Sequence, residues 1–381
     1  MARFELTPEQ DELQRAARGF AVRRLPVAHL RGLRDAREPL RLSREIWREM
    51  AQLGWAGIAI DEAHGGAGLG LVELGVVMEE LGRTLAPTPL LATSVIGAAA
   101  LAAGDEALRQ AYLPAIAAGE RLLALAFEEG RRFAPYTCRT TARRAPSGEG
   151  WIVDGDKTFV LDGVAADALI VVAREWGEPD DRDGLVLLVV DGSAAGVEVQ
   201  PLGMVDSRGT ARVRLAGVAV PDGNVLGAPG GGAELLDRLL ARATAALTAE
   251  MLGAADAVFH TTIEYLKQRH QFGVAIGSFQ ALKHRAAHMY CELELTRSVV
   301  RAALVAVETG AADADILVSA AKARASDVFV LVSGEAVQMH GGIGVTDDLD
   351  VGFYYKRARV TDLMFGSAAY HRDRFARLQG Y

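Results

Sequence analysis

Two groups of side chains in the C-terminal half combine residue types that suit a phosphorylated ligand. Arg269 carries a planar, permanently charged guanidinium that fits a diphosphate, although a surface arginine at a helix end explains it equally well. Phe272 and Phe279 are of a type found more often in a core, yet Phe272 is close enough to Arg269 to pack on an adenine or ribose. Gln280 and Gln338 carry amides that can bond ribose hydroxyls or phosphate oxygens. The combination indicates nucleotide chemistry, whereas each residue alone has a plain structural explanation.

The elements that must position these residues fall into three regions of different texture. Residues 1–121 are helical in pattern, and Thr7-Pro8-Glu9-Gln10 is a good helix start with Thr7 as N-cap. Residues 122–232 contain short apolar or β-branched runs separated by glycine-containing turns, which predicts a small antiparallel β domain. Residues 233–381 are helical again. The sequence therefore predicts an α+β protein of three domains with these boundaries.

The last region predicts an antiparallel four-helix bundle, because four long helical segments follow one another with short connections. The first covers 235–268, with Gly253 as its only interior glycine. The second opens at 277–278 and reaches 309–310, the third covers 312–339, and the fourth follows 347–348.

One glycine-rich stretch needs a separate explanation. Residues 61–70 lack a preceding strand and a phosphate-binding lysine, so a loop that needs positive φ is favoured over a phosphate site. A helix over 71–81 follows, and Gly82 is a plausible end for it.

Composition excludes several classes of function. The net charge of -8 and the absence of a dense basic run disfavour nucleic-acid binding. Cys138 and Cys291 are far apart, which argues against a zinc site or disulfide framework and fits a reducing cytoplasm. The N-terminal residues are charged almost at once, and the apolar stretches are too short to span a bilayer. We expect a cytoplasmic protein with no membrane segment and no metal.

Two specific motifs carry a family resemblance. Gln268 to Gly273 with Ile276 to Gln280 resembles the Arg-x-x-Phe-Gly…Ile-x-x-Phe-Gln block of acyl-CoA dehydrogenases, and Gln338 to Gly344 resembles their Gln-x-x-Gly-Gly-x-Gly block. Three weaker matches occur in the same order along the chain: Asp61 to Gly70, Gly155 to Lys157 and Pro221 to Gly227. The resemblance covers essentially the whole chain.

The resemblance implies FAD as cofactor and an acyl-CoA thioester as substrate. In this family the two blocks reach an FAD bound mainly by a neighbouring subunit, so at least a dimer is implied. The residues expected to contact the cofactor are Arg269, Gln271, Phe272, Gln280, Gln338, Met339, His340, Gly341 and Gly342.

The usual catalytic base is missing from the expected position. Dehydrogenation needs a carboxylate that removes the proton α to the thioester, and most of the family has a glutamate before a Gly-Thr pair. Here Gly366-Ser367 falls on that pair, so Phe365 occupies the place of the glutamate. Relatives with the base on the first bundle helix match it to Ala243, which is no base either. Glu250 and Asp362 are alternative bases, each more plausible as a structural residue.

The segments that meet the flavin ring also depart from the family. Residues 127–133 replace Thr-Glu-Pro-x-x-Gly-Ser-Asp, and Val160-Leu161-Asp162 replaces Ile-Thr-Asn or Ile-Ser-Asn, with loss of hydroxyl groups. The first hypothesis is therefore a partner subunit that shares the FAD of a heteromeric acyl-CoA dehydrogenase, as in sterol side-chain enzymes. The second is a self-sufficient homo-oligomer with a displaced base. The third is a non-catalytic acyl-CoA-binding protein, and an oxygen-using flavoenzyme is a weaker fourth.

Overall fold

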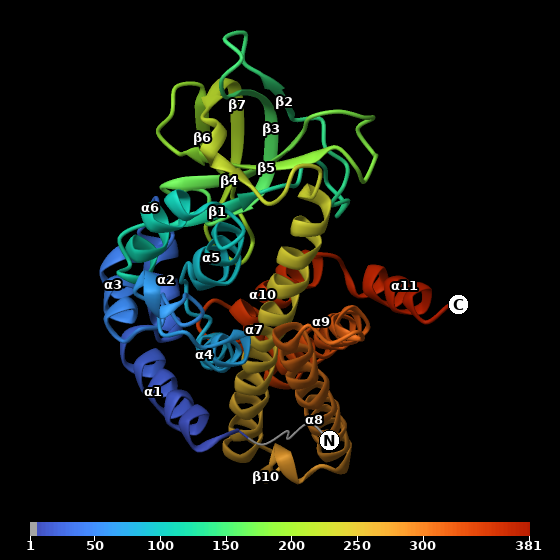
Figure 1. Ribbon diagram of the computed structural model, residues 1–381. Helices are drawn as coiled ribbons and strands as arrows, with labels where there is room; N and C mark the ends of the chain where they lie inside the picture. The colour runs from blue at the N-terminus through green and yellow to red at the C-terminus, as the bar shows by residue number, and fades with distance from the viewer. Residues whose placement is uncertain (1–5) are drawn as a thin grey trace. The chain divides into compact units, whose positions relative to one another are not determined.

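The computed structural model describes residues 6–381, so the first five residues of the predicted charged N-terminus lie outside the described part. The chain divides into two compact units, each assembled from separate stretches of sequence (Figure 1). We call them the helical unit and the β-containing unit. The helical unit consists of Met1–Arg31, Leu71–Ala86 and Thr244–Tyr381, and the β-containing unit consists of Gly32–Gly70 and Pro87–Ala243.

The β-containing unit is organised by one sheet with the strand order β6-β7-β3-β2-β4-β5-β8, in which β1 also pairs with β4. Apolar side chains on its inner face form the core, among them Val153, Val171, Leu188 and Val213, which are fully buried. The strands are β1 Leu123–Ala126, β2 Thr141–Arg144, β3 Trp151–Leu161, β4 Ala168–Arg174, β5 Leu185–Asp191, β6 Val197–Pro201, β7 Thr210–Val220 and β8 Val225–Leu226. This confirms the predicted β region.

The sheet is not purely antiparallel, which corrects the predicted strand arrangement. β1 pairs with β4 in parallel, and β2 pairs with β4 in parallel at Thr141 and Arg174. Parallel neighbours need a long crossover connection, and the long β3 strand lies in sequence between β1 and β4. A pairing of strands so far apart in sequence leaves no local signal in the turns.

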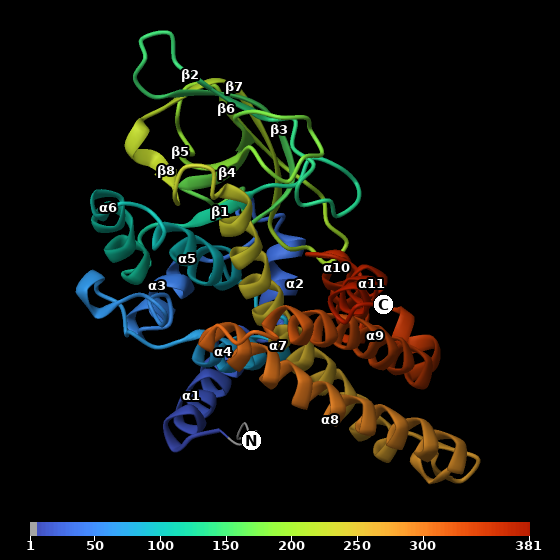
Figure 2. The same ribbon diagram turned by 45° about the vertical axis from the view of Figure 1, so that its right-hand side comes forward.

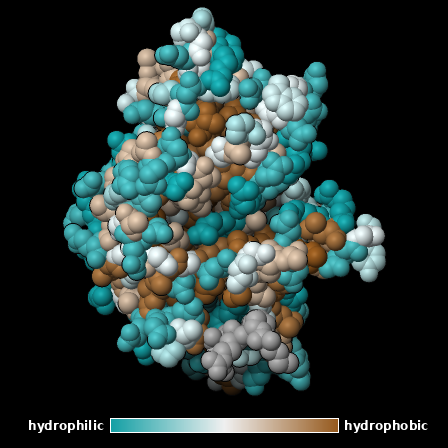
Figure 3. Space-filling model, viewed as in Figure 1, coloured by the Kyte–Doolittle hydropathy of each residue, from teal (hydrophilic) through white to brown (hydrophobic). Residues whose placement is uncertain are grey.

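Short helices complete this unit. They are α3 Arg44–Gln52, α5 Ala98–Leu101 and α6 Glu106–Ala117, with a π-helical segment over Leu90–Gly97; α2 Val27–Asp35 spans the boundary between the units. The glycine-rich run 61–70 is a loop in which Gly65 and Gly68 have φ of 80° and 62°, as the loop interpretation requires. Hydrophilic side chains cover most of the outer tip of the sheet, where the connection from β2 to β3 is exposed (Figure 3).

The helical unit contains the predicted long helices. Its members are α1 Pro8–Arg24, α4 Leu71–Arg83, the C-terminal part of α7 Gly232–Gln268, α8 Gln280–Thr309, α9 Ala314–His340, α10 Val351–Leu363 and α11 Ala368–Leu378. The helix start at Thr7 is confirmed, because the Thr7 side chain accepts from Gln10 N while the Gln10 side chain accepts from Thr7 N. The fourth predicted segment is two helices, since the chain breaks between Leu363 and Ala368. Figure 2 shows α8 and α9 as long neighbouring helices.

Two glycines determine how closely α4 and α7 approach. A Cβ on Gly82 would lie 2.2 Å from the carbonyl oxygen of Glu250, and one on Gly253 would lie 1.8 Å from that of Glu79. The two helix backbones therefore touch at a crossing that tolerates no side chain. Gly82 serves this crossing and does not end its helix, which continues to Arg83. No helix of the described residues is long and apolar enough to cross a membrane.

Candidate functional site

The hairpin between α7 and α8 presents the residues of the first motif to the outside. Its strands are β9 His270–Gln271 and β10 Val274–Ala275, and its two turn residues, Phe272 and Gly273, have φ of 52° and 79°. Positive φ at both positions is typical of the tight turns that suit twisted hairpins, but only the glycine adopts it without strain. The Phe272 side chain is 91% exposed at the tip.

An aromatic pair extends from this tip to the start of α8. The Phe272 and Phe279 rings meet edge to face with centroids 6.1 Å apart, and Phe279 is itself exposed. Arg269, Gln271 and Gln280 are exposed on the same short segment. An exposed ring pair beside a guanidinium is costly to leave in water, so this face is suited to cover a ligand or a protein surface.

The second motif ends α9 and divides into exposed and buried members. Gln338, Gly341 and Gly342 are exposed, and a Cβ on either glycine would meet nothing within 4 Å. Met339 and His340 are buried instead. Their backbone, and not their side chains, is thus what the exposed face can offer to a ligand.

His340 ties the end of α9 to the end of α7. Its ring stacks on Tyr265 with centroids 4.2 Å apart, and its Nδ1 lies 2.7 Å from the carbonyl oxygen of Ala336. The hydroxyl of Tyr265 donates to the carbonyl oxygen of His340. Because Tyr265 is one helical turn before Arg269, the structure brings the two sequence motifs to neighbouring places in the helical unit.

The turn that bears Phe365 is held in an unusual conformation. Phe365 is buried with φ of 54°, and Gly366 follows with φ of 102°. The fully buried ammonium of Lys322 donates to the carbonyl oxygens of Asp362 and Gly366 at 2.9 and 2.8 Å. Burial lowers the pKa of Lys322 to about 7, while the charge of Asp362 opposes that shift. The turn thus stays rigid although residue 365 carries no titratable group.

A histidine supports the same turn from α11. Nε2 of His371 lies 2.9 Å from the carbonyl oxygen of Phe365, and burial lowers the pKa of His371 to about 4. The imidazole is therefore neutral at physiological pH, which leaves Nε2 free to donate this bond.

Neither alternative base is poised for proton transfer. The carboxylate of Glu250 accepts from Nε and Nη2 of Arg357 at 2.9 and 2.8 Å, and both side chains are buried. A buried carboxylate committed to a guanidinium is a weak proton acceptor. Asp362 is half-buried and accepts from the backbone N–H of Ala368 at 3.2 Å. Both residues therefore have structural partners in the helical unit.

Three family models match successive parts of the chain. They are the N-terminal, middle and C-terminal domains of acyl-CoA dehydrogenases, over residues 7–120, 125–218 and 230–379. The chain is 33% identical to acyl-CoA dehydrogenase IpdE2 of Mycolicibacterium smegmatis, with 88% of this chain and 86% of that protein covered. The chain belongs to the acyl-CoA dehydrogenase family.

Solved structures of heteromeric relatives match nearly the whole acyl-CoA dehydrogenase chain. One is the ChsE4-ChsE5 complex from Mycobacterium tuberculosis, at 29% identity and a TM-score of 0.89 over 100% of both chains. Another is the Tcur3481-Tcur3483 steroid acyl-CoA dehydrogenase, at 33% identity and a TM-score of 0.87 over 97% of both chains. The predicted helical, β and helical organisation is confirmed by these findings, and FAD is confirmed as the cofactor at the level of the family.

The two halves of an FAD site fit this acyl-CoA dehydrogenase unequally. The exposed Arg269 and Phe272 face fits a dinucleotide, because it offers a guanidinium and rings that nothing else covers within the helical unit. The chain's own half, in the β-containing unit, lacks the hydroxyl donors expected there. Glu128 stands in that stretch, and burial raises its pKa to about 7. A carboxylate in this place does not replace a hydroxyl donor for a flavin ring.

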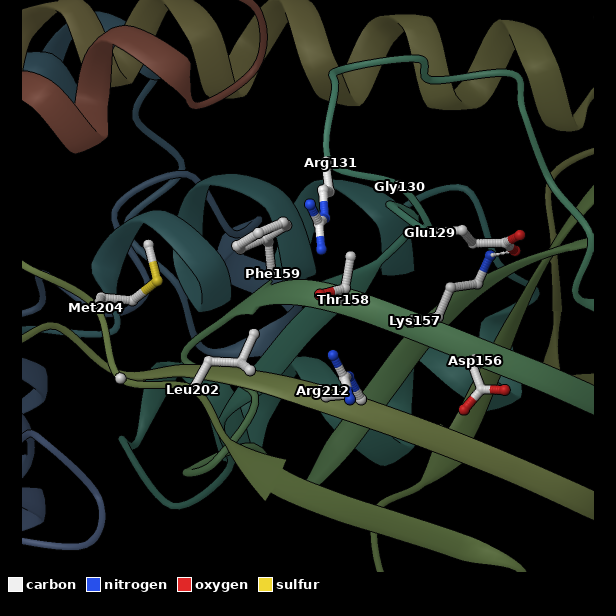
Figure 4. Close-up of a pocket in the computed structure, with 11 residues that line it drawn as sticks. Glu129, Gly130, Arg131, Asp156, Lys157, Thr158, Phe159, Leu202, Met204 and Arg212 are labelled. Carbon is white, nitrogen blue, oxygen red and sulfur yellow. Dashed lines mark hydrogen bonds and ion pairs between the residues drawn. The ribbon is translucent and has the colours of Figure 1, made fainter.

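A hollow of about 500 Å³ opens beside Glu128 in the β-containing unit (Figure 4). It is lined by Glu129, Gly130, Arg131, Asp156, Lys157, Thr158, Phe159, Leu202, Gly203, Met204 and Arg212. Lys157, fully buried, donates to Glu129 at 2.6 Å. Burial alone raises the pKa of Glu129, but Lys157 and other donors hold it down at about 2.

Sequence reasoning missed several residues of this hollow. A lysine inside an apolar strand must find a carboxylate, so the Lys157 pair with Glu129 had a usable signal. Phe159 had none, because its exposure follows from a register shift between β3 and β7 after Lys157. Arg131 and Arg212 come from segments that only the sheet brings together. Among the described residues, no group of three metal-binding side chains was found.

Proposed function

We propose that this chain is the non-catalytic, FAD-sharing subunit of a heteromeric acyl-CoA dehydrogenase. The observation that carries the proposal is a contrast within one chain. The Phe272 tip is 91% exposed beside Arg269, ready for a cofactor held elsewhere, while the base position holds the buried Phe365. A chain that kept one function and lost the other is best explained by a partner that supplies the rest.

The division of labour follows from the chemistry. FAD, when bound, accepts the hydride from the β carbon of an acyl-CoA thioester. Arg269 is suited to bind the cofactor diphosphate, and Phe272 to cover its adenine or ribose. Gln271, Gln280, Gln338 and the backbone at 339–342 can bond the polar edge of the nucleotide. The carboxylate that removes the α proton belongs to the partner subunit.

The relatives support a substrate class for the complex. One structural relative is described as a steroid acyl-CoA dehydrogenase and another as a two-component complex. We therefore propose a fatty acyl or sterol side-chain acyl-CoA as substrate, and a second acyl-CoA dehydrogenase chain as partner, in a cytoplasmic oligomer.

The test is the flavin absorbance of the purified protein, alone and co-expressed with candidate partner chains. We expect the isolated chain to be colourless or weakly flavinylated and inactive, and to gain both flavin and activity in the complex. Stoichiometric FAD in the isolated chain, with activity lost in Glu250→Gln, would instead establish a self-sufficient enzyme. Failure to bind FAD with every partner would favour a non-catalytic acyl-CoA-binding protein.

A further inference from the structure

Two guanidinium groups converge in the hollow of the β-containing unit. Arg131 comes from the segment after β1 and Arg212 from β7, and their side chains point toward one another across Thr158 (Figure 4). Neither guanidinium forms a hydrogen bond or ion pair within the described part of the chain. Like charges that face each other without an acid between them are unfavourable, so the arrangement fits an anion that bridges them.

The charges in the hollow favour an anionic ligand. Glu129 is already paired with Lys157, so these two side chains leave no net charge. The remaining charged groups are the two guanidiniums and the single carboxylate of Asp156. Positive charge is therefore in excess, and guanidiniums suit phosphate because they donate in a planar fork.

An exposed aromatic ring lies beside this pair. Phe159 is 41% exposed and has φ of 51° within β3, where the ladder to β7 shifts register. Left-handed backbone at a bulky residue costs roughly 1–3 kcal/mol, and such strain concentrates at ligand clamps. Leu202 and Met204 add apolar surface to the same hollow. The ring thus provides a stacking platform next to the arginines.

We propose that this hollow binds an adenosine diphosphate unit, with phosphate between Arg131 and Arg212 and the planar base on Phe159. A hollow of about 500 Å³ lies in the range that accommodates ligands of this size. Phosphate explains the two guanidiniums better than a flavin ring, which is uncharged and needs hydroxyl or backbone donors. FAD and CoA both contain this unit, and naming them as the two sources rests on the proposed function.

The experiment is calorimetric titration of the full-length chain with ADP, adenosine and inorganic phosphate. We expect ADP to bind, adenosine to bind at least tenfold more weakly, and added salt to weaken ADP binding. Arg131→Gln and Arg212→Gln should each weaken ADP binding about tenfold. Arg132→Gln is the matched control, because Arg132 is exposed next in sequence but does not line the hollow.

A second variant separates the ring from the charge. Phe159→Gly should weaken ADP binding but not phosphate binding, and it should fold, since glycine removes the strain at positive φ. Titration with FAD and with CoA then identifies the source, as the one whose affinity falls in Arg131→Gln. No ADP binding, or ADP binding unchanged in both arginine variants, would overturn the inference. The proposed function is judged separately, by flavin gain on co-expression, which depends on the helical unit.

Discussion

At the scale of single residues, Phe365 decides what this chain cannot do. The turn around it is as firmly held as a catalytic turn needs to be, by Lys322 from α9 and His371 from α11. A phenyl ring neither accepts nor donates a proton. The loss is therefore chemical and not conformational, and it can be tested by returning a carboxylate to the same backbone.

Phe365→Glu should not give acyl-CoA dehydrogenase activity to the isolated chain, because the chain's own flavin-ring segments have also changed. Burying an unpaired carboxylate at a site that is 6% exposed should lower the free energy of unfolding by about 3 kcal/mol or more. Phe365→Leu is the control that removes the ring without adding charge. Chemical denaturation and a dye-reduction assay measure the two effects. Turnover by the glutamate variant alone would contradict a division of labour between subunits.

At the scale of elements, the crossing of α4 and α7 is the most demanding contact in the helical unit. Gly82 and Gly253 each face a carbonyl oxygen of the other helix. Backbones this close lock the relative position of two helices, because neither can slide without a clash. The crossing adjoins Glu250, whose pairing with Arg357 joins α7 to α10.

Gly253→Ala should destabilise the protein by about 1–3 kcal/mol, since the added methyl group would overlap the carbonyl oxygen of Glu79. Gly334→Ala in α9 is the matched control, because its Cβ would meet its nearest atom, on Tyr355, at 3.9 Å. We expect that control to be neutral or stabilising by up to about 1 kcal/mol, from helix propensity alone. Thermal or urea unfolding compares them. Equal stabilities of the two variants would show that the crossing can relax.

At the scale of the whole molecule, the exposed motif face is of use only in an assembly. Arg269 and Phe272 make no enclosed site within the helical unit, so their contribution should appear when another chain brings the cofactor. The predicted dimer or larger oligomer remains a prediction, as do the individual cofactor contacts.

Arg269→Gln should raise the dissociation constant of FAD from the co-expressed complex about tenfold, because one charge-assisted contact to the diphosphate is lost. Its melting temperature as an isolated chain should not change, since the side chain is exposed. Arg377→Gln, an equally exposed arginine on α11, should alter neither quantity. FAD fluorescence on dilution measures retention. Unchanged retention in Arg269→Gln would remove this residue from the cofactor site.

The sequence alone determined the helix starts, the three regions and the family, because these depend on local signals. Thr7 caps its helix through residues three positions away, and the motifs at 268–280 and 338–344 are contiguous. The substitution of Phe365 for a carboxylate is also visible in sequence, because it concerns the identity of one side chain.

Only the tertiary structure decided which side chains face outward and which meet across elements. It buried Met339 and His340 beside Tyr265, paired Glu250 with Arg357, and paired β1 with β4 in parallel. It also brought Arg131 and Arg212 to one hollow from positions 81 residues apart in number. Such encounters depend on packing between distant segments, which leaves no periodic trace in either segment. The physical reason is that burial and pairing belong to the folded surface, whereas a sequence records only what each residue brings to it.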